Sequence, residues 1–214
     1  MSHSGPGPVS PADYWDERYG VSERIWSGNP NAALVRETAG LVPGRALDLG
    51  CGEGADAIWL AGQGWRVVAA DISRVALDRA AVHAGQAGVA DRIDWQRHDL
   101  AESFPDGAFD LVCAQFLHSP VDMPRGAILR SAAAAVVPGG VLLVVGHAGW
   151  PSWHAHPDLE VHFPAPDEVY QDLGLAPDTW ELLVSERHEQ EMNDPEGRPA
   201  TRTDNTLKVR RLPG

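Results

Sequence analysis

Short apolar runs alternate with longer segments of helical composition through the middle of the chain. Five of these runs predict β-strands, because each is short, apolar or alternating, and bounded by turn-forming residues. They cover residues 45–49, 66–70, 92–95, 110–114 and 141–146. The segments between them predict helices at residues 55–61, 74–86 and 125–137. Regular alternation of strand and helix predicts an α/β fold with a doubly wound, mostly parallel sheet.

Further elements are expected at both ends of this region. Helices are predicted over residues 13–24, 32–39 and 167–173, and strands over residues 180–187 and 205–211. In the first helix, Tyr14, Trp15 and Tyr19 alternate with charged residues, which is typical of an amphipathic helix that lies on another part of the protein. Pro30 favours the first turn of the second helix, and Asn29 before it is the expected cap.

Net charge and cysteine usage exclude several classes of partner. Acidic residues outnumber basic ones by 30 to 17, a net charge of −13, so we expect no nucleic-acid partner and no membrane partner. Cys51 and Cys113 lack the spacing of a disulfide framework or zinc site, which favours a reducing compartment. No apolar run approaches the roughly 20 residues of a membrane span, and residues 1–11 lack the pattern of a signal peptide. We therefore expect a soluble, cytoplasmic protein, either a monomer or a homodimer.

A glycine-rich turn follows the first predicted strand and opens a helix. The segment Asp48-Leu49-Gly50-Cys51-Gly52-Glu53-Gly54 has the context of a nucleotide-type cofactor loop. Glycines without Cβ atoms accept positive φ and let a ligand approach the backbone, while the helix N-terminus offers free N–H groups. An ordinary tight turn between strand and helix is the alternative interpretation.

Two acidic residues follow the next two predicted strands. Asp71 comes directly after residues 66–70, where a carboxylate accepts hydrogen bonds from ribose hydroxyls. A cap for the next helix is the alternative role for Asp71, although Ser73 is equally well placed to cap. Asp99 follows the third strand at the same sheet edge and is expected to accept from an adenine amino group, unless it is an ordinary loop carboxylate.

These residues together resemble the class I S-adenosylmethionine (SAM)-dependent methyltransferases. The turn at Asp48–Gly54 is similar to the first motif of that family, Asp71 to its ribose-binding acid and Asp99 to its adenine-side acid, over about residues 45–146. The resemblance implies SAM binding, a Rossmann-like fold of seven strands with the last antiparallel, and the amino-acid portion of SAM near the turn. The implied cofactor-binding residues are Asp48, Gly50, Cys51, Gly52, Asp71, Ile72, Asp99, Leu100 and Gln115.

A looser similarity concerns the N-terminal segment. Residues 14–19 and Trp26 resemble small-molecule methyltransferases of the tellurite-resistance and thiol (thiopurine) S-methyltransferase type. We expect residues 1–11 to be a disordered tail and residues 12–214 to be a single domain. Its parts would be a helical lid (12–40), the cofactor-binding core (45–146) and a candidate substrate loop (147–166).

A nicotinamide-dependent oxidoreductase is an alternative with the same turn and ribose acid. Its pyrophosphate favours G-x-G-x-x-G, whereas this turn reads G-x-G-x-G and carries Asp48 and Glu53. Carboxylates repel a pyrophosphate but suit the ammonium and sulfonium of SAM. We therefore favour SAM.

Candidate catalytic residues follow the fourth and fifth strands, because ligands of open α/β sheets lie beyond the carboxyl ends of the strands. His118 is the candidate base, and a structural histidine is the alternative. Cys51 is a poor candidate nucleophile, because its place inside the cofactor turn is explained by small size. His147 and Trp153 are expected to belong to a substrate-covering loop, in which a plain packing role is the alternative for the tryptophan.

The remaining histidines and aromatics leave further alternatives open. The stretch after His147 is rich in histidine, but its spacing matches no usual metal framework, so we expect no metal. The aromatic rings of Tyr14, Trp15, Tyr19 and Trp26 are expected either to cover the sulfonium by cation–π contact or to anchor the helix.

The sequence predicts methyl transfer to a small-molecule nucleophile, with a thiol or other chalcogen favoured because soft nucleophiles need little base assistance. An O- or N-methyltransferase fits the same sheet. A non-catalytic SAM-binding regulatory protein is the alternative from another class.

Overall fold

The computed structural model describes residues 10–154 and 161–214. Most of the expected disordered tail, residues 1–9, lies outside the described residues, as do residues 155–160 of the expected substrate loop. At residues 10–11 the expectation of a tail is wrong, because helix α1 (Pro11–Gly20) begins there. The Ser10 hydroxyl accepts a hydrogen bond from the Asp13 amide and caps the helix, and Pro11 fits its first turn.

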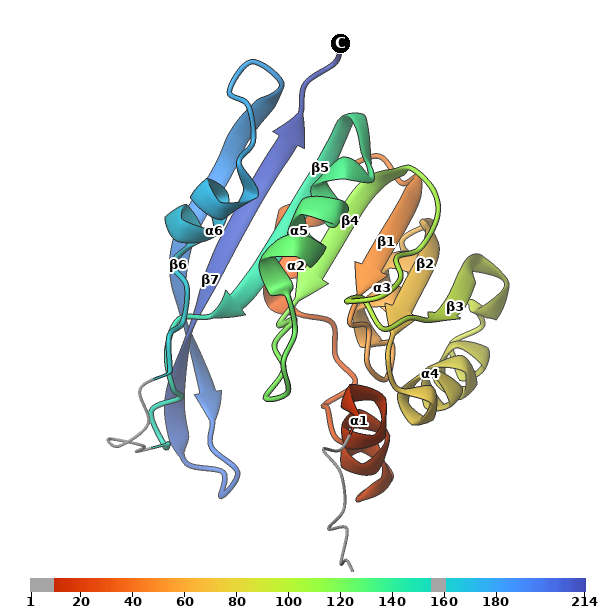
Figure 1. The fold of residues 1–214 in the computed structure, drawn as a ribbon. Helices are drawn as coiled ribbons and strands as arrows, with labels where there is room; N and C mark the ends of the chain where they lie inside the picture. The colour runs from red at the N-terminus through yellow and green to blue at the C-terminus, as the bar shows by residue number, and fades with distance from the viewer. Residues whose placement is uncertain (1–9, 155–160) are drawn as a thin grey trace, which may run out of the picture.

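A seven-stranded sheet with the order β3-β2-β1-β4-β5-β7-β6 forms the centre of the described protein (Figure 1). Its strands are β1 (Arg45–Leu49), β2 (Arg66–Asp71), β3 (Ile93–Arg97), β4 (Phe109–Gln115), β5 (Val136–His147), β6 (Trp180–Asn193) and β7 (Pro199–Arg211). Strands β1 to β5 pair in parallel, and β7 pairs antiparallel with both β5 and β6. This confirms a Rossmann-like, mostly parallel sheet whose last strand is antiparallel.

Alternate residues of the strands enter two separate cores, because successive side chains of a strand point to opposite faces. Leu47, Leu49 and Val112 pack on one face with α5 (Arg125–Ala134) and α6 (Pro166–Leu173). The opposite face is covered by α2 (Ala32–Thr38), α3 (Ala55–Gly62) and α4 (Arg74–Gln86). Strands buried on both faces explain the nearly continuous apolar runs of the sequence.

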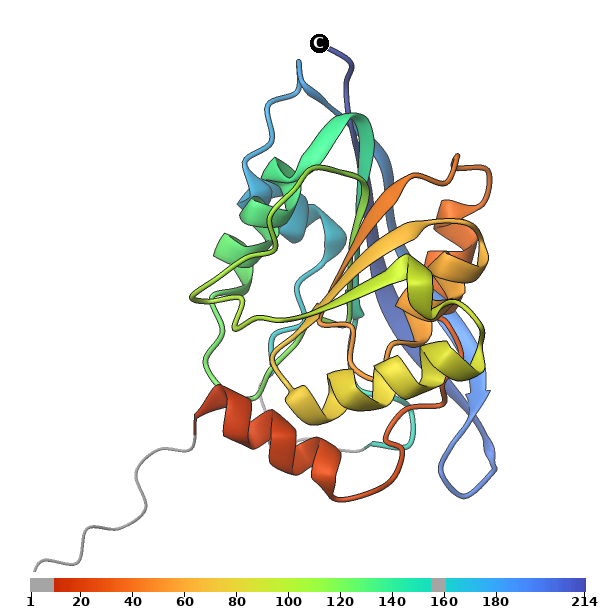
Figure 2. The same cartoon turned by 90° about the vertical axis from the view of Figure 1, so that its right-hand side faces the viewer.

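Helix α1 lies outside both cores, beside α4 at the carboxyl ends of the parallel strands (Figure 2). Asp16 holds it there, because its carboxylate accepts hydrogen bonds from the Ser73 hydroxyl at 2.6 Å and the Val75 amide at 3.2 Å. Tyr19 is buried beneath the helix. The expected helix over residues 13–24 is therefore present, but it ends at Gly20 and covers the sheet edge.

Several element boundaries differ from those predicted. The expected cap Asn29 is wrong, because Asn31 precedes the first residue of α2 and holds the carboxylate of Asp56. Helix α5 ends three residues early at Ala134, since β5 already begins at Val136. The largest difference is the β6–β7 hairpin, which is longer at its polar tip than the apolar pattern indicated. Main-chain pairing carries the hairpin past the end of β5, beyond the carboxyl edge of the sheet (Figure 1).

No helix within residues 10–154 and 161–214 has the length and apolar character needed to cross a membrane.

Candidate active site

A cavity of about 800 Å³ opens at the carboxyl ends of the parallel strands. Every predicted cofactor-binding residue lines it, namely Asp48, Gly50, Cys51, Gly52, Asp71, Ile72, Asp99, Leu100 and Gln115. The cavity is also lined by His118, His147, Trp15, Tyr19 and Trp26. Two predicted lid residues lie elsewhere: Tyr14 packs edge-on against Trp15, and the Trp153 ring is tilted against His154. The sheet edge thus brings together side chains from five strands and the N-terminal segment.

The glycine-rich turn is held against β2 by its backbone. The amides of Gly50 and Cys51 both donate to the carbonyl oxygen of Ala70, at 2.8 and 3.1 Å. Gly50 and Gly52 have φ of +72° and +53°, values that residues with a Cβ rarely adopt. A Cβ at Gly50 would lie 2.8 Å from Leu117 Cδ1, and one at Gly52 would lie 2.8 Å from the Tyr19 hydroxyl. Both glycines are therefore required by the turn and by its close neighbours.

Asp71 connects the turn to the next helix. Its two carboxylate oxygens accept hydrogen bonds from the amides of Gly52 at 2.8 Å and Ser73 at 2.9 Å. Ser73, and not Asp71, caps α4, because its hydroxyl accepts from the Ala76 amide. Burial raises the pKa of Asp71 above its usual value. The hydrogen bonds from the two amides lower the pKa, but the effect of burial is larger. Each oxygen retains a second lone pair that can accept from a ligand in the cavity.

Two further carboxyl groups are buried beside the turn. Burial, reinforced by the charge of Asp56, raises the pKa of Asp48 well above its usual value. Burial also raises the pKa of Asp56, although Asn31 donates to its carboxylate from both backbone and side chain. Asp48 Oδ2 is buried and has no hydrogen-bond partner among the described residues. Adjacent buried acids with an unpaired oxygen favour a cation at this end of the cavity.

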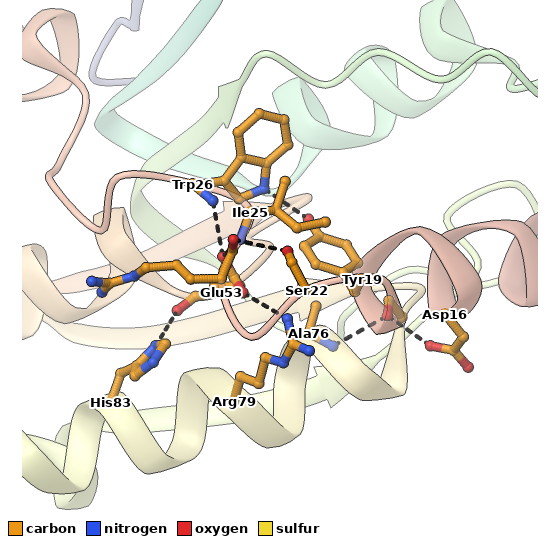
Figure 3. A network of polar contacts seen from close by, with 11 residues as sticks. Asp16, Tyr19, Ser22, Ile25, Trp26, Glu53, Ala76, Arg79 and His83 are labelled. Carbon is orange, nitrogen blue, oxygen red and sulfur yellow. Dashed lines mark hydrogen bonds and ion pairs between the residues drawn. The ribbon is translucent and has the colours of Figure 1, made fainter. Parts of the chain in front are cut away.

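Glu53 connects the N-terminal segment to the glycine-rich turn (Figure 3). Its Oε2 accepts from the amides of Ile25 and Trp26, each at 3.1 Å, and its Oε1 pairs with Arg79 of α4 at 3.0 Å. The Trp26 indole N–H donates to the Tyr19 hydroxyl at 3.2 Å. The aromatic residues of the segment are thereby fixed over the glycine turn. The sequence indicated Glu53 only as a negative charge in the turn. Its hydrogen-bond and ion-pair partners are distant in the chain, so the sequence did not predict them.

Asp99 and Cys51 line the same end of the cavity. Asp99 Oδ1 accepts from the Ala101 amide at 3.0 Å, so this carboxylate stabilises its own turn while it faces the cavity. Burial raises the pKa of the Cys51 thiol well above its usual value, and nearby Asp71 adds to the effect. A thiol that stays protonated is a weak nucleophile, in agreement with its predicted role as a small residue of the turn.

The other end of the cavity begins where β4 ends. Both amide atoms of Gln115 are buried, and neither has a hydrogen-bond partner in the described part of the chain. Phe116 has φ of +53°, a left-handed conformation that costs energy in a residue with a side chain. Strain and unpaired buried polar atoms are concentrated at functional sites. These features favour ligand contact beside Gln115.

His118, the predicted base, is largely enclosed. Burial, the nearby positive charge of Arg125 and His147 lower its pKa to about 4, so the imidazole is neutral at pH 7. Its Nε2 atom is buried without a partner among the described residues, facing Gly146. Its catalytic role stays a prediction, and a base with a pKa this far below neutrality is poorly matched to proton removal at pH 7.

A second histidine in the cavity has a carboxylate partner that sequence reasoning missed. Nδ1 of His147 lies 3.2 Å from Oδ1 of Asp204, which is buried in β7. Arg202, also in β7, lines the cavity and lies over the Phe116 ring, with its guanidinium carbon 4.9 Å from the ring centre. The sequence placed the start of this strand at residue 205, so neither Arg202 nor Asp204 was assigned to the site.

No group of three His, Cys, Asp or Glu side chains within residues 10–154 and 161–214 is arranged to hold a metal ion. His156, part of the histidine-rich stretch, lies outside the described residues.

Residues 46–140 match a protein family described as a methyltransferase domain. Two curated relatives carry the same kind of description. The 27-O-demethylrifamycin SV methyltransferase of Amycolatopsis mediterranei is 35% identical over 136 residues, which cover 60% of this chain and 47% of the relative. The ubiquinone biosynthesis O-methyltransferase of Ralstonia nicotianae is 36% identical over 110 residues, which cover 50% of this chain and 44% of the relative. The chain thus spans about half the length of these relatives.

Solved structures share the fold at low sequence identity. A protein studied for the conversion of a disulfide bond into a thioacetal group in echinomycin biosynthesis has a TM-score of 0.71, is 24% identical, and aligns over 94% of this chain and 92% of its own. TehB from Haemophilus influenzae has a TM-score of 0.65 and 17% identity, over 94% of this chain and 66% of its own. DhpI, solved as a complex with S-adenosylhomocysteine (SAH), has a TM-score of 0.55 and 25% identity, over 86% and 84% of the two chains.

Proposed function

The chain belongs to the class I SAM-dependent methyltransferases, and on this premise we propose that it transfers a methyl group from SAM to a small-molecule nucleophile. The observation that carries the proposal is the composition of the cavity of about 800 Å³ at the carboxyl ends of the strands. Buried acids and the glycine turn form one end, and Phe116 and His147 form the other. A cationic methyl donor and a neutral acceptor fit these two ends respectively.

The proposed donor end uses the acids according to their positions. Asp71, fixed by two backbone amides, accepts from the ribose hydroxyls of SAM. Asp48, with its unpaired oxygen, faces the positive amino-acid portion beside the turn. Asp99 lies farthest along the sheet edge and accepts from the adenine amino group. Trp15, Tyr19 and Trp26 cover the donor and exclude water. Glu53 accepts from the amides of Ile25 and Trp26 and so holds this segment over the turn.

The acceptor end suits a small molecule, because Arg202 of β7 and the residues after β4 line it within a cavity of about 800 Å³. Both curated relatives are named as methyltransferases, and both names include an oxygen position. The fold neighbours include a protein that acts on a sulfur group and TehB. A thiol or other chalcogen acceptor, predicted from the sequence, therefore stays a prediction beside a hydroxyl or an amine.

Incubation with SAM and a panel of thiols, phenols and amines, followed by mass spectrometry, tests the proposal. We expect one acceptor class to gain the mass of a methylene group while SAH accumulates in equal amount. SAH formation must disappear in the Gly50→Val variant, which controls for contaminating enzymes. Binding of SAM without any methylated product would instead support a regulatory SAM-binding protein. Preferential binding of NADH would support the oxidoreductase alternative.

Asp48→Asn is expected to stabilise the ligand-free protein and to weaken SAM binding. The raised pKa of Asp48 means that the folded protein disfavours the charged form of this carboxyl group. The resulting loss of folding stability is absent below the usual carboxyl pKa and grows as the pH rises from that value to the raised pKa. Near pH 7 we expect the unfolding midpoint to rise by about 2–4 °C, the response to about 1 kcal/mol in a domain of this size. The gain should vanish at acid pH.

Differential scanning calorimetry from pH 4 to 8, with isothermal titration of SAM, measures both effects. Asp178→Asn is the matched control, because Asp178 is exposed between α6 and β6. A variant that is less stable at pH 7 would show that Asp48 does not destabilise the ligand-free protein. A variant that binds SAM as the wild type does would show that Asp48 does not contact the ligand.

A further inference from the structure

His147 and Asp204 form a pair at the acceptor end of the cavity. They lie opposite each other in the register of β5 and β7, and Nδ1 of the imidazole is 3.2 Å from the Asp204 carboxylate. Asp204 is 1% exposed, and its other oxygen accepts from Arg202 at 2.8 and 3.1 Å and from Gln190 at 3.2 Å. A buried carboxylate with these donors is held in one orientation and fixes the histidine ring in turn.

The imidazole ring of His147 packs against two other rings, and one of its nitrogens remains available. Phe116 packs on it with 4.5 Å between ring centres, and His118 stacks on it at 5.6 Å. Nε2 of His147 makes no hydrogen bond to any residue that the structure describes, whereas the side chain as a whole is 35% exposed at the cavity. The strained backbone of Phe116 places its ring against this histidine. Such an arrangement orients a base rather than a packing residue.

We propose that His147, oriented by Asp204, removes the proton of the methyl acceptor, and that the acceptor is a phenolic or enolic hydroxyl. This inference rests on the proposed methyl transfer. Nδ1–H of His147 donates to Asp204, and Nε2 takes the hydroxyl proton. The acceptor oxygen forms a bond to the methyl carbon, while the bond from that carbon to sulfur breaks and its electron pair stays on sulfur, giving neutral SAH. The imidazolium, stabilised by Asp204, then releases its proton to water.

The presence of an oriented base discriminates between acceptor classes. A thiol ionises readily near neutral pH and needs little assistance, and a neutral amine can attack before it loses a proton. A phenol is a weak nucleophile until its proton is removed, so it gains most from a base. The apolar lining by Phe116 and Met123 suits a flat ring.

Charged and titratable groups reach the pair from several elements. Asp204 contacts the His147 ring from β7, Arg202 of the same strand donates to the other oxygen of Asp204, and His118 stacks on the ring from the loop after β4. Arg125 of α5 lies behind His118 and lowers its pKa, so His118 stays neutral and adds no positive charge near pH 7. The Asp204 carboxylate is therefore in direct contact with the ring, where its negative charge offsets the positive charge that the ring gains during the reaction.

Nitrogen NMR of the full-length protein tests the pair without any turnover. In the neutral imidazole of His147 we expect the tautomer with the proton on Nδ1, and a shift of the Nε2 resonance when catechol is added to the SAH-loaded protein. Asp204→Asn should reduce the preference for that tautomer. A proton on Nε2 in the wild type, or an Nε2 resonance indifferent to catechol, would overturn the proposal.

Kinetics with SAM and two probe acceptors test the chemistry. For catechol we expect His147→Gln to lower kcat by about 100-fold or more, with the SAM affinity retained. The loss should be much smaller for 4-nitrocatechol, whose phenol ionises more readily. His188→Gln is the matched control, since His188 is exposed on β6 in register with Asp204. Losses of the same size with both probes, or below threefold with catechol, would overturn the role as base.

Failure of the underlying methyl transfer has a different signature. An enzyme that binds no SAM, or that methylates nothing in the panel, contradicts the proposed function, and the NMR measurement still decides whether the pair exists. Methyl transfer to thiols alone contradicts the acceptor class while the proposed function stands.

Discussion

Replacing Gly50 by valine is expected to abolish SAM binding, with an affinity loss of at least about 100-fold, or about 2.7 kcal/mol. The residue has φ of +72°, where a β-branched side chain is strained, and its Cβ would meet Leu117 Cδ1 at 2.8 Å. Both effects displace the turn whose amides bind Ala70 and whose surface lines the cavity. Isothermal titration calorimetry with SAM and SAH measures the loss.

Gly40→Val is the matched control for this substitution. Gly40 also has a positive φ, +83°, but a Cβ there meets nothing within 4 Å, and the residue lies outside the cavity lining. The control therefore carries the same kind of backbone strain without obstructing the proposed site. Normal SAM binding by a folded Gly50→Val protein would remove the glycine turn from the binding site.

Asp71→Asn is expected to weaken SAM binding by about 1.5–3 kcal/mol, which is roughly 10- to 150-fold. The variant keeps the size of the side chain but loses the charge that strengthens hydrogen bonds to ribose hydroxyls. In the wild type, both carboxylate oxygens of Asp71 accept from backbone amides, those of Gly52 and Ser73. The asparagine side chain has one oxygen and one NH₂ group, so its NH₂ group faces one of these two backbone N–H donors. Truncation to alanine would leave both backbone donors unpaired, so asparagine separates binding from folding more cleanly.

Asp78→Asn provides the comparison for Asp71. Asp78 lies on α4 with its side chain 74% exposed, paired only with Arg74 at 3.8 Å, and we expect no change in SAM affinity. Circular dichroism and calorimetry of both variants exclude unfolding as the cause. Equal SAM affinities for the Asp71 variant and the wild type would place the ribose elsewhere.

The proposed cofactor end of the site was predictable because its determinants are local in the chain. The apolar runs of β1 and β2 lead directly into Gly50 and Asp71, so the positions of these residues follow from the alternation of strand and helix. Glycines at fixed spacing mark the turn, since its positive φ angles exclude other residues. All nine predicted cofactor-binding residues line one cavity for this reason.

The acceptor end was less predictable because its determinants are distant in the chain. His147 and Asp204 are 57 residues apart and meet only through the pairing of β5 with an antiparallel β7. The hairpin that carries Asp204 continues past the apolar pattern on main-chain hydrogen bonds, which leave no trace in hydrophobicity. Likewise, no sequence pattern indicates the positive φ of Phe116, because tertiary packing imposes it.

A crystal structure of the complex with SAH would test the proposed cofactor site. We expect SAH in the cavity, with its ribose hydroxyls at hydrogen-bond distance from Asp71, its amino group beside Asp48 and its sulfur turned toward His147. SAH bound outside this cavity, or with its ribose away from Asp71, would overturn the proposed site.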